Sequence, residues 1–117
     1  MTCDAISVHG RKYVFPIDGQ ISDEQDALDF LSACYEHETD LIMLPYECLS
    51  EEFMDLSTKL AGLFLQKLTN YGIKTAAVID TERLSERFRE FSYESAKGNA
   101  FRVFESIADA EKWLVAD

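Results

Sequence analysis

The spacing of apolar residues near the start of the chain predicts a β-hairpin. Two short runs rich in β-branched and aromatic residues, Ala5–His9 and Lys12–Phe15, flank Gly10 and Arg11. A glycine turn between two such runs is typical of a hairpin, because glycine adopts the backbone conformations that tight turns need. We therefore expect two antiparallel strands here.

Three later runs predict strands inside the fold. Asp40–Pro45 and Ile73–Ile79 are almost wholly apolar, as strands buried on both faces are. Proline closes the first of these runs and cannot continue a strand ladder. Phe101–Phe104 is shorter and supplies the last strand.

The segments beside these strands carry apolar residues at helical spacing. In one of them Leu60, Phe64 and Leu68 form a single stripe, and Gly72 ends it. Thr81 is placed to cap the helix that follows the next strand. The helices that we expect cover residues 22–38, 55–72, 81–98 and 106–116.

The predicted order is ββαβαβαβα. Strands that alternate with helices form a mainly parallel sheet, and right-handed crossovers cover its faces with helices. We expect one α/β domain over residues 1–117, with three layers and a five-stranded mixed sheet whose opening hairpin is antiparallel.

The net charge of the chain limits the classes of partner that we expect it to bind. The chain has 11 basic and 22 acidic residues and a formal net charge of −11. Such a charge repels phosphate backbones and anionic lipid, so we expect neither nucleic acid nor membrane as a partner. A basic surface on another protein fits better, and the charge also serves solubility.

The cysteines and the first residues indicate a reducing compartment. Cys3, Cys34 and Cys48 are odd in number and show no metal-binding spacing. Asp4 stands where a signal peptide would be positive or apolar. No apolar run reaches the ~18 residues of a membrane span. We expect a cytoplasmic protein.

The central run FMDLSTKLAGLFLQKLTNYGIKTAAV, with FSYESAKG and FRVFES after it, resembles an uncharacterised bacterial family, domain-of-unknown-function family 4180. The likeness extends from about Asp40 to Leu114. It rests on the D-L-x-T-x-L-A-G core and the Y-E-S-x-K-G helix end. This resemblance implies ancestry and no particular chemistry.

The order of elements, with FMD at a strand-to-helix junction, also looks like STAS domains, the fold of anti-sigma factor antagonists. That resemblance implies a serine at this junction whose phosphorylation breaks partner binding. Here Asp55 matches the acid of the motif, but Leu56 stands where the serine is usual. The switch carries over only if Ser57 or Thr58 replaces that serine.

The candidate site is therefore the start of the helix expected at residue 55, with Asp55, Leu56, Ser57, Thr58 and Lys59 as contact residues. Ser57 and Thr58 are also candidates for phosphorylation, because a helix N-terminus favours an anion. The simpler interpretation is capping, since aspartate, serine and threonine are the residues that cap helices.

Glu94 is the sixth candidate contact residue. It lies one position from the apolar stripe of its helix, so we expect it to be partly buried and paired with Lys97 or Arg102. A structural ion pair and a ligand-contacting carboxylate are both open. If the end of this helix lies beside residue 55, Glu94 and Asp55 form one acidic cluster.

Catalytic signatures are missing. The chain has no phosphate-binding glycine loop, no GxSxG and no HExxH. Asp80 and Glu105 follow parallel strands and could join Asp55 at the carboxyl edge, as a magnesium site requires. Capping explains Asp80 more simply, and we expect no metal or cofactor.

These observations favour a non-catalytic regulatory or protein-interaction domain. Its expected contact surface is Glu51–Lys59, at the start of the 55–72 helix, with the end of the 81–98 helix beside it. The partner is another protein, with self-association left open. The rival interpretation is a small-molecule-binding protein or weak hydrolase with Asp55, Asp80 and Glu94 over the strand ends.

Overall fold

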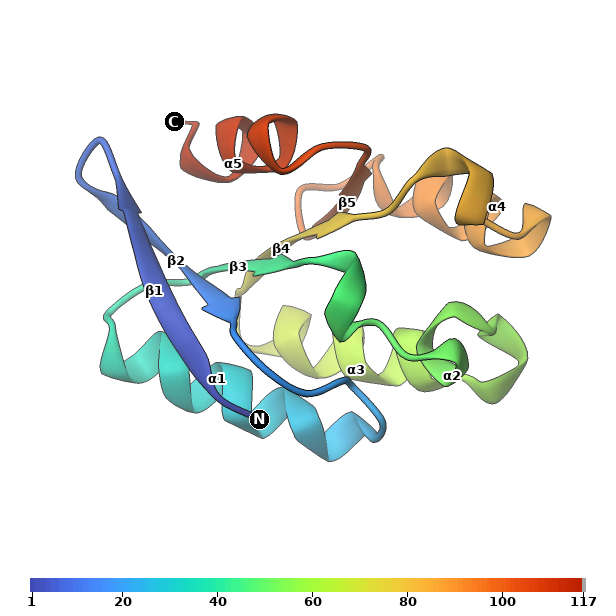
Figure 1. The fold of residues 1–117 in the computed structure, drawn as a ribbon, viewed down its shortest axis with the longest axis horizontal. Coiled ribbons are helices and arrows are strands. Elements are labelled where there is room, and N and C mark those ends of the chain that lie inside the picture. Colours follow the sequence, from blue (N-terminus) through green and yellow to red (C-terminus); the bar gives the residue numbers. More distant parts are fainter. Residues whose placement is uncertain (117) are drawn as a thin grey trace.

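A computed structural model describes residues 1–116 and contains a five-stranded sheet in the order β1-β2-β3-β4-β5 (Figure 1). The hairpin strands β1 and β2 are antiparallel, and all later neighbours pair in parallel. The strands are β1 Cys3–Val8, β2 Arg11–Pro16, β3 Leu41–Leu44, β4 Lys74–Val78 and β5 Phe101–Phe104. The predicted mixed sheet is confirmed.

The helices form two layers around the sheet. They are α1 Ala27–Glu36, α2 Glu51–Met54, α3 Leu60–Asn70, α4 Glu86–Ser95 and α5 Ile107–Val115. Each parallel crossover moves to the next strand in the same direction, so right-handed crossovers bring their helices to one face. Figure 1 shows α1 and α3 along that face and α5 along the other. The three-layer prediction is confirmed.

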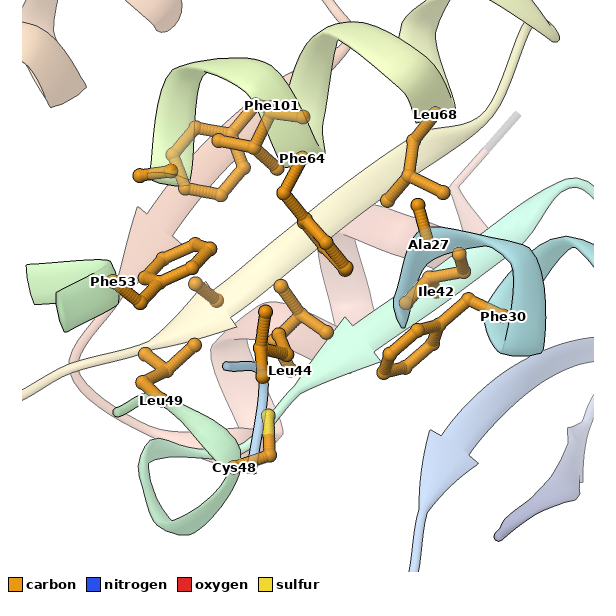
Figure 2. Packing of buried hydrophobic residues seen from close by; sticks show 14 of the residues in the cluster. Ala27, Phe30, Ile42, Leu44, Cys48, Leu49, Phe53, Phe64, Leu68 and Phe101 are labelled. Atoms are coloured by element: carbon orange, nitrogen blue, oxygen red, sulfur yellow. The ribbon is translucent and has the colours of Figure 1, made fainter. Parts of the chain in front are cut away.

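Each face has its own apolar core. The larger core joins α1, α3 and α4 to the sheet through a chain of aromatic contacts that includes Phe30, Phe64, Phe53 and Phe88. Figure 2 shows Phe30 from α1 and Phe64 from α3 pointing toward one another, with Ile42 close to them. The smaller core, under α5, consists of Tyr13, Leu41, Met43, Ala76, Ala110 and Leu114.

The helix expected at residues 55–72 is interrupted. A separate turn of helix, α2, comes first and is followed by a 3-10 turn over Leu56–Thr58. Lys59 then adopts a left-handed conformation with φ of 66°, which costs a non-glycine residue about 1–2 kcal/mol. This residue turns the chain so that Leu60 begins α3 with its side chain in the core.

The helix expected at residues 81–98 is also shorter, and Thr81 does not cap it. Asp80 caps a 3-10 turn over Thr81–Arg83, and Ser85 caps α4 by accepting the Phe88 N–H at 3.1 Å. Leu84 lies between the two in an extended conformation. Two capping residues within six positions therefore divide one predicted helix into two elements.

Candidate interaction site

The candidate site lies beyond the carboxyl ends of the parallel strands, where the chain leaves β3. We call residues 50–59 the contact segment; it contains α2, the 3-10 turn and Lys59. Ser50 anchors its start, because its hydroxyl donates to the Ile21 carbonyl at 2.5 Å and accepts the Phe53 N–H at 3.1 Å. Ile21 lies in the loop after β2 and forms an isolated parallel β-bridge with Leu49.

Phe53 anchors the middle of the contact segment. Its ring is fully buried, with its centroid 5.9 Å from that of Phe64 and 6.2 Å from that of Phe88 (Figure 2). The neighbouring Glu51 and Glu52 are exposed, while Met54 and Leu56 are half-buried. Core contacts of Phe53 therefore hold the contact segment in place, and its accessible side chains are partly acidic and partly apolar.

Asp55, Ser57 and Thr58 form a local capping network. The Asp55 carboxylate accepts the Ser57 hydroxyl at 2.6 Å and the Ser57 N–H at 2.9 Å. These two bonds, the hydroxyl first, lower the pKa of Asp55. Thr58 Oγ1 lies 2.7 Å from the Glu52 carbonyl and 2.8 Å from the Asp55 carbonyl. The predicted capping role of Asp55 is confirmed, although it caps the 3-10 turn rather than α3.

Three neighbouring hollows along this edge share lining residues. The first, of about 630 Å³, includes Phe15–Gln20, Pro45 and Glu47 in its lining. Gln20 and Glu47 also line the second, of about 730 Å³, which reaches Arg83. Glu51 and Met54 line both the second and the third, of about 350 Å³, which ends at Leu56 and Arg87. We call this row of three hollows the acidic groove.

Charges are distributed unequally along the acidic groove. Its acidic residues are Asp18, Glu47, Glu51, Glu52 and Asp55. Its bases are Arg83, in the loop after β4, and Arg87, in α4. The Arg83 guanidinium lies 4.6 Å from the Tyr46 ring centroid, and a hydrogen bond to Tyr46 raises the pKa of Arg83. The groove thus carries an excess of negative charge, with one of its two bases held by an aromatic ring.

Residues 11–114 match the family described as a domain of unknown function (DUF4180). The chain belongs to this family. The DUF4180 match begins with β2 and includes the contact segment, the acidic groove and α4. Neither the curated proteins nor the solved structures contained a match to the chain.

In this DUF4180 chain Glu94 does not lie beside Asp55, so the two do not form the acidic cluster that we considered. It is exposed, and its carboxylate pairs with Lys97 at 3.1 Å, so the predicted pair is confirmed and the predicted burial is wrong. The start of α4, with Ser85 and Arg87, lies beside Asp55 instead of its end. Glu94 bonds within its own helix end because α4 runs away from the contact segment.

The carboxylates after β4 and β5 are engaged locally. Asp80 accepts the Glu82 N–H at 3.1 Å, and Glu105 accepts the Thr81 hydroxyl at 2.5 Å. Within residues 1–116, no three histidine, cysteine, aspartate or glutamate side chains are grouped so that they could hold a metal ion. Asp80 therefore acts as a cap here.

The thiols are poor nucleophiles in this structure. Burial raises the pKa of Cys34 and of Cys48 to about 12, and that of Cys3 to about 11. A thiol with such a pKa is protonated at neutral pH, and the thiolate is the reactive form. Cys34 and Cys48 are buried in the larger core and act as small apolar residues.

Sequence reasoning missed Gln20, Tyr46, Arg83 and Arg87 as members of the site. One signal was available, because three of the five arginines lie between positions 83 and 89. In an acidic chain this cluster marks a surface of different charge.

Among residues 1–116, no helix has the length and apolar character needed to cross a bilayer.

Proposed function

We propose that this protein is a non-catalytic regulatory domain that binds another protein through the contact segment. The observation that carries the proposal is the combination of a fixed backbone and an outward surface of mixed character. Ser50 and Phe53 hold the segment, so a partner that contacts Met54, Leu56 and Asp55 meets a backbone that is already ordered.

The resemblance to STAS domains supports a role of the same type. In the proposed role, Asp55 and Ser57 occupy the junction that STAS proteins use for partner binding. A phosphoryl group on Ser57 would bring roughly −1.5 to −2 charges next to the carboxylate that the hydroxyl now contacts. Repulsion between the phosphate and Asp55 would open the cap and alter the surface that the partner contacts. Phosphorylation of Thr58 would likewise break the bonds of its hydroxyl to the Glu52 and Asp55 carbonyls.

We place the domain in the cytoplasm, where its thiols stay reduced. Self-association is a second partner class, because β1 is an edge strand of the sheet. Asp4 covers part of that edge by accepting the Ala5 N–H at 2.8 Å. We therefore favour a different protein as the partner.

A small-molecule-binding protein or weak hydrolase is the second candidate. One observation favours it: the hollow of about 730 Å³ lies over the strand ends, where open α/β sheets bind ligands, and combines Arg83 with Glu47 and Ser50. A metabolite that co-purifies with the protein and survives desalting would support this candidate.

A pull-down from cell lysate tests the interaction proposal. We expect the wild type to capture a specific protein that the Leu56→Asp/Ser57→Asp variant loses. The matched control is Leu28→Asp/Ser32→Asp, which adds the same charges at exposed positions on α1. The control should capture the protein as the wild type does, once circular dichroism shows that both variants are folded. Equal capture by all three proteins would overturn the proposal.

A further inference from the structure

The apolar floor of the acidic groove is accessible to water at its two ends. Ile17 is 60% exposed at one end, and Met54 and Leu56 are half-buried at the other. Pro45 and Leu49 lie between them in the lining but are buried, so the accessible apolar side chains are at the two ends. Accessible apolar side chains that line a groove are typical of protein-binding sites, because their burial releases water.

The groove lining contains four acidic residues, which we call its acidic wall. They are Asp18, Glu47, Glu51 and Glu52, from the loops after β2 and β3 and from α2. Within residues 1–116, Glu47, Glu51 and Glu52 have no ion-pair partner. The two arginines of the groove come from the loop after β4 and the start of α4. Arg83 lies over the Tyr46 ring, and the hydrogen bond to Tyr46 and, to a smaller extent, attraction to Glu47 raise the pKa of Arg83. In the part of the chain that the structure describes, Glu51 and Glu52 line the groove without a salt bridge.

The negative charge of the acidic groove indicates which class of partner fits it. A second copy of the chain would bring another net charge of −11 and be repelled. Nucleic acid and anionic lipid carry the same sign and are disfavoured for the same reason. A protein segment with lysine or arginine beside apolar residues matches both the wall and the floor.

On the basis of the proposed function, we infer that the partner enters the acidic groove with a basic amphipathic segment. Its apolar side chains lie on Ile17, Met54 and Leu56, and its cations lie against Glu47, Glu51 and Glu52. The contact segment forms one end of this groove, so the regulatory surface and the groove bind one partner element.

A synthetic peptide of 17 leucine and lysine residues, patterned as an amphipathic helix and fluorescently labelled, tests this inference. Its affinity is measured by fluorescence anisotropy. We expect Glu47→Gln/Glu51→Gln/Glu52→Gln to weaken binding by about tenfold, as three lost charge contacts would. The control Glu36→Gln/Glu90→Gln/Asp109→Asn removes the same charge from exposed positions elsewhere and should weaken binding less than about twofold.

Equal weakening by the two triple variants would mean that the peptide follows only net charge, and would overturn the inference. A second peptide, in which serine replaces every leucine, tests the apolar floor. We expect it to bind the wild type at least about tenfold more weakly, because it buries little apolar surface. Equal affinity for the two peptides would also overturn the inference.

Competition separates this inference from the proposed function. We expect the leucine–lysine peptide to displace the protein that the wild type captures from lysate. If that protein is lost with Leu56→Asp/Ser57→Asp but stays bound in excess peptide, the basic occupant is wrong and the proposed function stands. If neither the variant nor the peptide affects capture, both are wrong.

Discussion

Replacing Phe64 with alanine lowers the free energy of unfolding by about 3–5 kcal/mol, the largest effect that we expect from one substitution in this chain. Phe64 is fully buried, and its ring meets Phe30 at a centroid distance of 5.6 Å and Phe53 at 5.9 Å, both edge to face. Alanine removes both contacts and leaves a cavity that the surrounding helices only partly fill. Equilibrium denaturation in urea measures the loss.

The neighbouring Leu63 supplies the control for Phe64. Leu63 lies on the outer side of α3 and is 47% exposed, so Leu63→Ala should cost less than about 1 kcal/mol. Similar losses at positions 63 and 64 would contradict the assignment of Phe64 to the core. Because Phe53 rests on Phe64, we also expect faster amide exchange in the contact segment of Phe64→Ala.

Ser50→Ala is expected to lower the free energy of unfolding by about 2 kcal/mol. Loss of the α2 cap accounts for about 1 kcal/mol, and the stranded Ile21 carbonyl accounts for about another 1 kcal/mol. Ser50 is 9% exposed and Ile21 is fully buried, so water does not readily replace the lost bond. Urea denaturation measures the stability, and amide exchange at Phe53 reports the loss of the cap.

Ser85 is the matched control for Ser50. Both hydroxyls accept a backbone N–H at 3.1 Å from the third residue of their helices, but Ser85 is exposed. We expect Ser85→Ala to cost only about 1 kcal/mol, the value of a cap. Equal losses from the two serines would show that the bond from Ser50 to Ile21 contributes nothing to the anchoring of the contact segment.

The sheet could be predicted because its signals are local. The apolar runs of β3 and β4 are bounded by Pro45 and Gly72, and the hairpin turn contains Gly10. The break before α3 could not be predicted, because Lys59 is a good helix former and gives no sign of a left-handed conformation. Burial of Phe53 and anchoring of Ser50, both tertiary contacts, fix the path that forces this turn.

In the candidate site, too, features that depend on local sequence could be predicted, and features that depend on tertiary contacts could not. The cap formed by Asp55 and Ser57 spans only two positions, and the residue types at an expected helix start were enough to predict a capping role. The place of Glu94 depends on the direction of α4, which short-range pattern does not contain. Gln20 and Arg83 enter the groove from loops far from the contact segment in sequence, and only the parallel sheet brings these loops to one edge.

Site-specific photo-crosslinking in cells tests the contact segment most directly. A benzophenone amino acid is placed at Leu56 in one variant and at Tyr35 in another. Tyr35 is 89% exposed and lines a larger hollow, of about 950 Å³, at the opposite edge of the parallel strands. We expect a discrete crosslinked protein from position 56 and none from position 35. Crosslinking from position 35 alone, or from neither position, would contradict the proposed role of the contact segment.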